Sequence, residues 1–145
     1  MKKLLFSALT AITFATSSTT ARDIAITADK LPQEAKKFLN DYFPQNSVVS
    51  ATHDNDITDN DYTVILDNGT KIEFDSAGRW ESVKSRNGKM AAGVVPAAIQ
   101  GYITEHYPTF GIEKIERKRF GYEVELTNNI ELKFDSKGKF MGADN

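Results

Sequence analysis

Apolar side chains recur at helical spacing in two segments of the chain. In the first segment they form one stripe, made of Leu31, Ala35, Phe38, Leu39 and Tyr42. In the second segment the same spacing is occupied by Val95, Ile99, Tyr102, Ile103 and His106. Apolar residues three and four positions apart bury one side of a helix. The pattern predicts two amphipathic helices, which have Pro32 and Pro96 in their first turns and end at Pro44 and Pro108.

Alternating apolar and polar residues follow each predicted helix. Residues 62–67 and 71–75 alternate on either side of Asn68-Gly69, and residues 122–126 and 130–135 alternate around Asn128-Asn129. Alternation with a period of two indicates strands with one buried face, and Asn-Gly favours a tight hairpin turn. We expect further strands at residues 47–52, 79–84, 112–118 and 139–142.

The two patterns match residue by residue. The helical segments are offset by 64 residues and the hairpins by 60, and the difference lies between Pro44 and Tyr62. We interpret the chain as a tandem repeat, at about 28–88 and 92–142, within a single domain over 22–145. Each repeat contributes a helix and three or four antiparallel strands. The predicted fold class is α+β, with one antiparallel sheet, helices on one face and the other face open.

The polar strand positions define the open face of the predicted sheet. Five charged residues there form the predicted protein-binding face: Lys71, Glu73, Glu123, Glu125 and Lys133. The opposite positions are apolar and should pack under the helices. An uncovered, charged face of an antiparallel sheet is either ordinary solvated surface or a docking surface.

These motifs resemble a known family. The paired Leu-Pro or Val-Pro helix starts, the aromatic-Pro helix ends, Tyr-x-Val-x-Leu and Phe-Asp-x-x-Gly-x-aromatic are similar to the PepSY-like periplasmic proteins of Bacteroides-type bacteria. The resemblance covers roughly residues 28 to 142. It implies a fold like that of the β-lactamase inhibitor protein, with the exposed sheet face as a protein-binding surface. The motifs are turns and core positions, so no inhibitor contact residue carries over.

The first 21 residues have the order of a secretory signal peptide. Lys2 and Lys3 precede an apolar run of 11 residues, and small residues lead to a cleavage site between Ala21 and Arg22. A buried N-terminal helix is the alternative. The run is too short to span a membrane, which needs about 20 residues, and we expect no transmembrane segment after signal removal. With no lipobox cysteine, the predicted location is the periplasm or the exterior.

Composition excludes several functions. The chain has no cysteine and two histidines, so thiolate chemistry is absent and most histidine-based metal and triad sites lack ligands. Removing Lys2 and Lys3 moves the net charge from −2 to −4. The basic residues at 114–119 are interleaved with glutamates, so we expect no nucleic-acid partner.

An acidic loop is the candidate for metal binding. Residues 53–61 contain one histidine and four carboxylates, which are Asp54, Asp56, Asp59 and Asp61. An EF-hand loop needs glycine at its sixth position and glutamate at its twelfth. Counted from Asp54, those positions hold Asp59 and Ile65, so a solvated loop is the preferred interpretation and calcium the alternative. We expect no cofactor.

Other candidate residues favour structure over chemistry. His106 lies on an apolar helix stripe, where a partly buried packing role is expected. Trp80 should share the inward face of Phe74, although tryptophan also anchors interfaces. No Gly-x-Ser-x-Gly motif is present, and Glu73 paired with Glu123 or Glu125 should be ordinary surface acids.

The sequence therefore predicts an exported, non-enzymatic binding protein. Its open sheet face would meet another protein or peptide of the cell envelope, as an inhibitor or regulator of an envelope or secreted enzyme. The alternative is a small-ligand or calcium-binding module that uses the acidic loop, and an enzyme would require a pocket lined by titratable groups.

Overall fold

The computed structural model describes residues 23–145, and the predicted signal peptide lies outside them. The first part of the chain contains β1 (Asp23–Ala25), a short 3-10 helix η2 (Ala28–Lys30), α2 (Gln33–Tyr42), β2 (Val48–Asp54), β3 (Tyr62–Leu66), β4 (Lys71–Phe74) and β5 (Trp80–Lys84). The second part contains α3 (Ala97–His106), β6 (Ile112–Lys118), β7 (Gly121–Leu126), β8 (Glu131–Asp135) and β9 (Phe140–Asp144).

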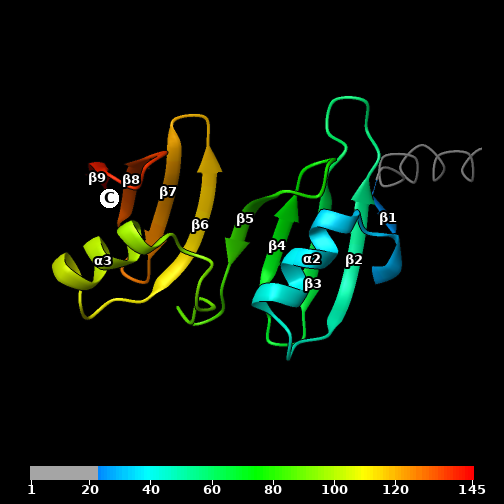
Figure 1. Ribbon diagram of the computed structural model, residues 1–145, viewed down its shortest axis with the longest axis horizontal. Coiled ribbons are helices and arrows are strands. Elements are labelled where there is room, and N and C mark those ends of the chain that lie inside the picture. Colours follow the sequence, from blue (N-terminus) through cyan, green and yellow to red (C-terminus); the bar gives the residue numbers. More distant parts are fainter. Residues whose placement is uncertain (1–22) are drawn as a thin grey trace, which may run out of the picture.

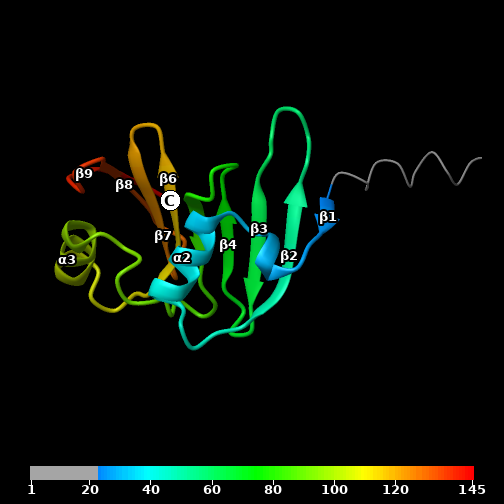
Figure 2. The ribbon, with the colours of Figure 1, turned by 45° about the vertical axis from the view of Figure 1, so that its right-hand side comes forward.

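One antiparallel sheet contains all nine strands, in the order β1 to β9, so each strand pairs with the next one in the chain. Both α-helices lie on the same side of this sheet (Figures 1 and 2). The α+β class, the single open sheet and the helices on one face are confirmed. None of the helices among residues 23–145 is long and apolar enough to cross a membrane.

The core lies between the sheet and the helices. Residues paired in register share a face of a sheet, and one apolar row crosses six neighbouring strands: Val64, Ile72, Val83, Ile115, Val124 and Leu132. Every side chain in this row is fully buried. Burial of apolar surface contributes about 25 cal/mol per Å² to folding. The buried row therefore stabilises the packing of the helices on the sheet.

Each helix places an aromatic ring against the strands below it. Phe38 of α2 meets Phe74 edge-on, with ring centroids 5.8 Å apart, and Tyr102 of α3 meets Phe134 in the same way at 5.5 Å. Edge-to-face contacts of this kind add about 0.5–1.5 kcal/mol beyond area burial. The two helices therefore pack on the sheet through equivalent aromatic contacts. The helix residues of the two contacts are 64 positions apart in the sequence, and the strand residues are 60 positions apart.

Two turns bring the sheet close to the helix starts. Gly78 and Gly138 have positive φ angles of 87° and 84°. A Cβ atom at Gly78 would lie 2.8 Å from the Cβ of Pro32, and one at Gly138 would lie 2.9 Å from the Cβ of Ala98. Glycine is required at both turns because backbone conformation and space each exclude a side chain.

The structure corrects some predicted boundaries. Strand β1 was not predicted, and β2 extends to Asp54, beyond the predicted residues 47–52. Pro32 and Pro96 precede the helices, in extended backbone, and are not in the first turns. A proline there loses no helical hydrogen bond, because the first N–H groups of a helix have no partner within it.

Candidate functional site

The face of the sheet away from the helices carries two rows of mainly polar residues. Cα pairing in register defines the first row, which contains Thr52, Thr63, Glu73, Ser82, Glu116, Glu123 and Lys133. The second row contains Ser50, Ile65, Lys71, Lys84, Lys114, Glu125, Glu131 and Asp144. All five residues of the predicted binding face belong to these two rows. No described helix lies on this side of the sheet (Figure 2).

Ion pairs neutralise only part of this open face. The carboxylate of Glu116 forms ion pairs with the ammonium groups of Lys114, at 3.3 Å, and Lys118, at 3.6 Å. The ammonium group of Lys133 pairs with the carboxylate of Asp144 at 3.3 Å. Lys71 and Lys84 have no ion pair with any residue in 23–145, and Glu125 and Glu131 have none either. Sequence reasoning missed Lys84, Lys114 and Glu116 on this face, because bulges in β5 and β6 interrupt the period-two alternation of these strands.

A second feature is an acidic cluster at one end of β3, β4 and β5. Burial raises the pKa of Asp61, and the nearby carboxylates of Asp59 and Asp75 raise it further. Burial likewise raises the pKa of Glu81, helped by repulsion from Asp61 and Asp75. Like charges held close together favour the protonated form. This end of the sheet is therefore a region of concentrated negative charge.

The acidic loop closes the connection between β2 and β3. The backbone N–H of Asp54 donates to the carbonyl of Asp61 at 2.8 Å, and His53 and Asn60 are joined through their side chains at 2.6 Å. Asp56 accepts from the backbone N–H of Ile57 at 2.8 Å. Within residues 23–145, no three or more histidine or acidic side chains converge in a group that could hold a metal ion.

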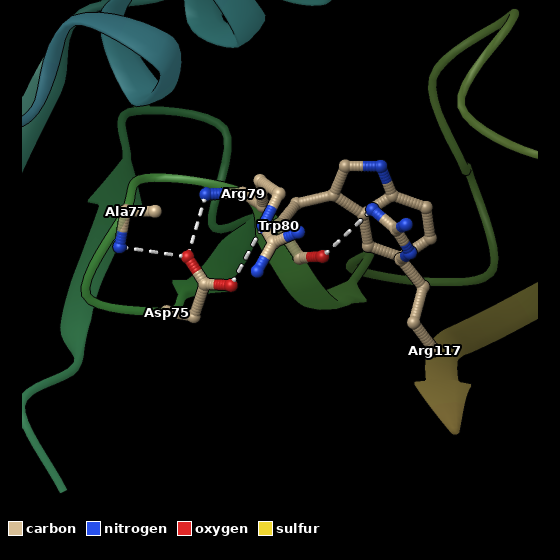
Figure 3. A network of polar contacts seen from close by, with 5 residues as sticks. All are labelled: Asp75, Ala77, Arg79, Trp80 and Arg117. Carbon is tan, nitrogen blue, oxygen red and sulfur yellow. Dashed lines mark hydrogen bonds and ion pairs between the residues drawn. The ribbon is translucent and has the colours of Figure 1, made fainter. Parts of the chain in front are cut away.

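A third feature is a group of side chains around Trp80. It lies at the junction of the two halves of the sheet, where β5 pairs with β6. The guanidinium carbon of Arg117 lies 5.3 Å from the centre of the Trp80 ring (Figure 3), and the ring of Tyr122 is 6.4 Å away. Phe38 of α2 contacts the same indole at 6.1 Å. Trp80 pairs with Phe74 in register as predicted. Its side chain is half-buried.

The turn beside Trp80 is organised by one carboxylate. Asp75 accepts backbone N–H groups from Ala77 and Arg79, each at 2.9 Å, and the Arg79 side chain donates to it at 3.1 Å (Figure 3). Burial opposes the ionised form of Asp75, but these hydrogen bonds outweigh it, and the pKa lies below its ordinary value. Asp75, Arg79, Trp80, Glu81 and Arg117 line a half-open hollow of about 220 Å³.

Two hollows near α3 contain little that could catalyse a reaction. One of about 650 Å³ runs from Met90 to Gln100 and is lined by apolar side chains, glycine, proline and an amide. Another of about 300 Å³ lies beside α3, and Lys89 and Tyr107 are its titratable groups. Neither holds the pair of acid and base groups that general acid–base catalysis requires.

His106 is partly buried at the C-terminal end of α3. Its side chain keeps 46% of its accessible surface and stacks on Tyr102, with ring centroids 4.0 Å apart. One ring nitrogen, Nδ1, lies 3.0 Å from the backbone carbonyl of Tyr102. The predicted packing role, with partial burial, is confirmed at this last residue of α3.

These features define an α+β protein with one helix-covered sheet face and one exposed, charged face. The chain belongs to the PepSY-like family, described as "Putative beta-lactamase-inhibitor-like, PepSY-like", whose model matches residues 60–142. The resemblance stated from the sequence is thereby confirmed. No curated protein matches the chain.

Solved structures of similar proteins come from Bacteroides species. A "putative calcium-regulated periplasmic protein" of Bacteroides thetaiotaomicron is 39% identical, with a TM-score of 0.81, and the match covers 87% of this chain and 99% of that one. Two proteins of Bacteroides vulgatus, each described as a "putative periplasmic protein", are 40% and 31% identical, with TM-scores of 0.76 and 0.78. Each match covers 85% of this chain, and 97% and 99% of theirs. The second of these is described as having unknown function.

Proposed function

We propose that the chain is an exported, non-enzymatic binding protein that docks another protein or peptide of the cell envelope through its open sheet face. In this role it would inhibit or regulate an envelope or secreted enzyme. The observation that carries the proposal is the pair of polar rows on a face that no described helix covers. Periplasmic relatives support the location, and the lack of an acid–base pair in the two hollows near α3 argues against catalysis.

The predicted contact residues of this face are Lys71, Glu73, Glu123, Glu125 and Lys133. Charged groups across an interface set specificity and association rate more than total affinity. A partner should therefore respond to charge reversal here, and the response should weaken at high salt as the charges are screened.

Affinity capture from envelope extract tests the proposal. The bait is the mature chain, compared with a Glu73→Lys, Glu125→Lys variant and with a Glu34→Lys control on the helix side. We expect the double variant to lose a specifically captured protein that the native bait and the control retain. An identical set of captured proteins for all three baits would contradict the proposal.

Calcium binding at the acidic loop is the second candidate function. It is favoured by the raised pKa of Asp61 and by the relative that is described as calcium-regulated. A divalent cation would relieve repulsion among Asp54, Asp56, Asp59 and Asp61, and loops of this kind use such oxygen ligands. Because these groups do not converge in the structure, binding would require the loop to rearrange.

Calorimetric titration with calcium tests this second candidate. Calcium binding predicts released or absorbed heat and a raised melting temperature, both reduced in an Asp59→Asn, Asp61→Asn variant and retained in Asp144→Asn. No heat and no shift in melting temperature for the native chain would end the calcium hypothesis and leave the protein-binding proposal intact.

We also propose that the two halves arose by tandem duplication and that export removes residues 1–21. Matching core residues 60 apart, such as Phe74 and Phe134, support the duplication. A hybrid in which residues 62–74 are replaced by residues 122–134 should keep a native circular dichroism spectrum, and an unfolded hybrid would count against it. N-terminal sequencing of the exported chain should begin at Arg22.

A further inference from the structure

The second polar row of the open face is divided by charge. On β4, β5 and β6 it presents Lys71, Lys84 and Lys114, and on β7, β8 and β9 it presents Glu125, Glu131 and Asp144. Neighbouring strands lie about 4.8 Å apart. Three positive charges are therefore followed by three negative charges along one line across the sheet.

This arrangement places like charges directly opposite each other within the chain. Lys84 pairs in register with Lys71 on one side and Lys114 on the other, and Glu131 pairs with Glu125 and Asp144. Like charges directly opposite each other on neighbouring strands destabilise the sheet. A partner surface would offset this repulsion if it placed negative charges opposite the three lysines and positive charges opposite the three acidic residues.

The same row, turned by a two-fold axis, has that reverse pattern. An axis that runs along the strands between β6 and β7 exchanges β4 with β9, β5 with β8 and β6 with β7. It would bring Lys84 opposite Glu131 of a second copy, Lys71 opposite Asp144 and Lys114 opposite Glu125. Each contact occurs twice, because a two-fold interface uses the same patch on both subunits.

We propose that the open face binds the same face of a second copy of this chain, in a two-fold, salt-sensitive dimer. The inference rests on one part of the proposed function, namely that this face docks a protein, and it adds a second copy of the chain as an occupant of the same face. Two sheets can pack face to face about 10 Å apart with strands about 30° apart, a gap that opposed lysine and glutamate side chains can span.

The first row is compatible with this arrangement. The axis brings Ser82 opposite Lys133 and Glu73 opposite Gly142, and neither contact is repulsive. Glu116 would face Glu123, which is a like-charge contact, but Glu116 is already neutralised by two lysines at 3.3 and 3.6 Å. In the second row, Lys71, Lys84, Glu125 and Glu131 have no ion pair within residues 23–145 and dominate the match, whereas Lys114 and Asp144 already contact Glu116 and Lys133.

Sedimentation equilibrium of the mature chain at low and high salt tests the dimer. The Debye length falls from about 10 Å at 0.1 M salt to about 3 Å at 1 M, so we expect dimers at low salt that dissociate as salt is added. A monomer at every concentration and salt level would overturn the inference. The capture experiment would still stand, because it depends on a different partner.

A charge-swap pair makes the test specific. Lys84→Glu and Glu131→Lys should each raise the dissociation constant of their own homodimer by about tenfold or more, because each creates two like-charge contacts. An equimolar mixture of the two variants should form a heterodimer of near-native affinity, since every swapped charge then meets its opposite. Glu34→Lys and Lys89→Glu serve as controls away from this face and should leave the native dimer unchanged.

Two results would overturn the inference even if a dimer is found. One is a dimer that both single variants form as tightly as the native chain, which would place the interface elsewhere. The other is a pair of weakened variants that fail to associate when mixed, provided that their circular dichroism and melting temperatures match those of the native chain.

Discussion

The half formed by α2 and β2–β5 and the half formed by α3 and β6–β9 bury matching side chains but expose different charges. Val64, Leu66 and Phe74 are buried in the first half, and Val124, Leu126 and Phe134 are buried 60 positions later. The strand ends differ. Where the first half has Asp61, Glu73 and Glu81, the second has Gly121, Lys133 and Met141.

The difference at Asp61 and Gly121 has a backbone cause. Gly121 has a φ angle of 147°, and a Cβ atom there would lie 2.3 Å from the carbonyl oxygen of Phe134. The short β6–β7 turn therefore requires glycine. The longer β2–β3 loop of the first half relieves this constraint, so an acidic residue can take the equivalent place. The core restrains both halves alike, and the longer loop of the first half allows an acidic residue at position 61, where the second half needs glycine.

Removal of a central aromatic ring should produce the largest effect. Phe74→Ala and Phe134→Ala each delete a fully buried ring and should each cost about 3–5 kcal/mol of unfolding free energy in urea. The single tryptophan, Trp80, reports on the junction of the halves. If the halves unfold together, Phe134→Ala lowers the Trp80 fluorescence midpoint as much as the circular dichroism midpoint. An unchanged fluorescence midpoint would show that they unfold separately.

Substitution of the two turn glycines should have a smaller and unequal effect. Gly78→Ala and Gly138→Ala both force alanine into a left-handed conformation, at about 1–2 kcal/mol each. We expect Gly78→Ala to cost more. Its Cβ would meet backbone as well as a side chain, with the nitrogen of Ala35 at 3.0 Å, whereas Gly138 meets the side chain of Ala98. Equal losses in thermal unfolding would contradict this ranking.

Loss of the cation over Trp80 should weaken the junction by about 0.5–1 kcal/mol. Arg117→Ala removes the guanidinium 5.3 Å from the indole, and Arg117→Lys keeps a positive charge but changes its shape. We expect a shifted Trp80 emission maximum in Arg117→Ala and partial recovery in Arg117→Lys. If both variants have the same emission maximum as the native chain, the predicted interaction between Arg117 and Trp80 is wrong.

The smallest effect concerns the acidic cluster. Burial and neighbouring carboxylates raise the folded-state pKa of Glu81. The neutral form thus favours folding, and this contribution is present below the unfolded-state pKa and is lost as pH rises through the folded-state pKa. Glu81→Gln should raise stability near neutral pH by a few tenths of a kcal/mol, since the site is largely exposed and screened. The gain should vanish well below the ordinary glutamate pKa; a gain that is independent of pH would contradict the charge explanation.

Periodicity was sufficient to predict both helices and most strands, because the helix stripes and the alternation from Tyr62 to Phe74 are regular. The same alternation placed Lys71 and Glu123 on the exposed face. Strand β1 was missed because three residues carry too short a pattern. The junction at Trp80 and Arg117 depends on pairing between β5 and β6, which are separated by α3, and no local pattern encodes that contact.

The strand order has a consequence for how the chain folds. Every strand is hydrogen-bonded to its neighbour in the sequence, from β1 to β9, so most contacts join residues close together along the chain. Folding rates rise as the mean sequence separation of contacts falls. The sheet can therefore grow by adding one strand at a time from its N-terminal end, and a chain that emerges N-terminus first can begin to fold before its last strands are free.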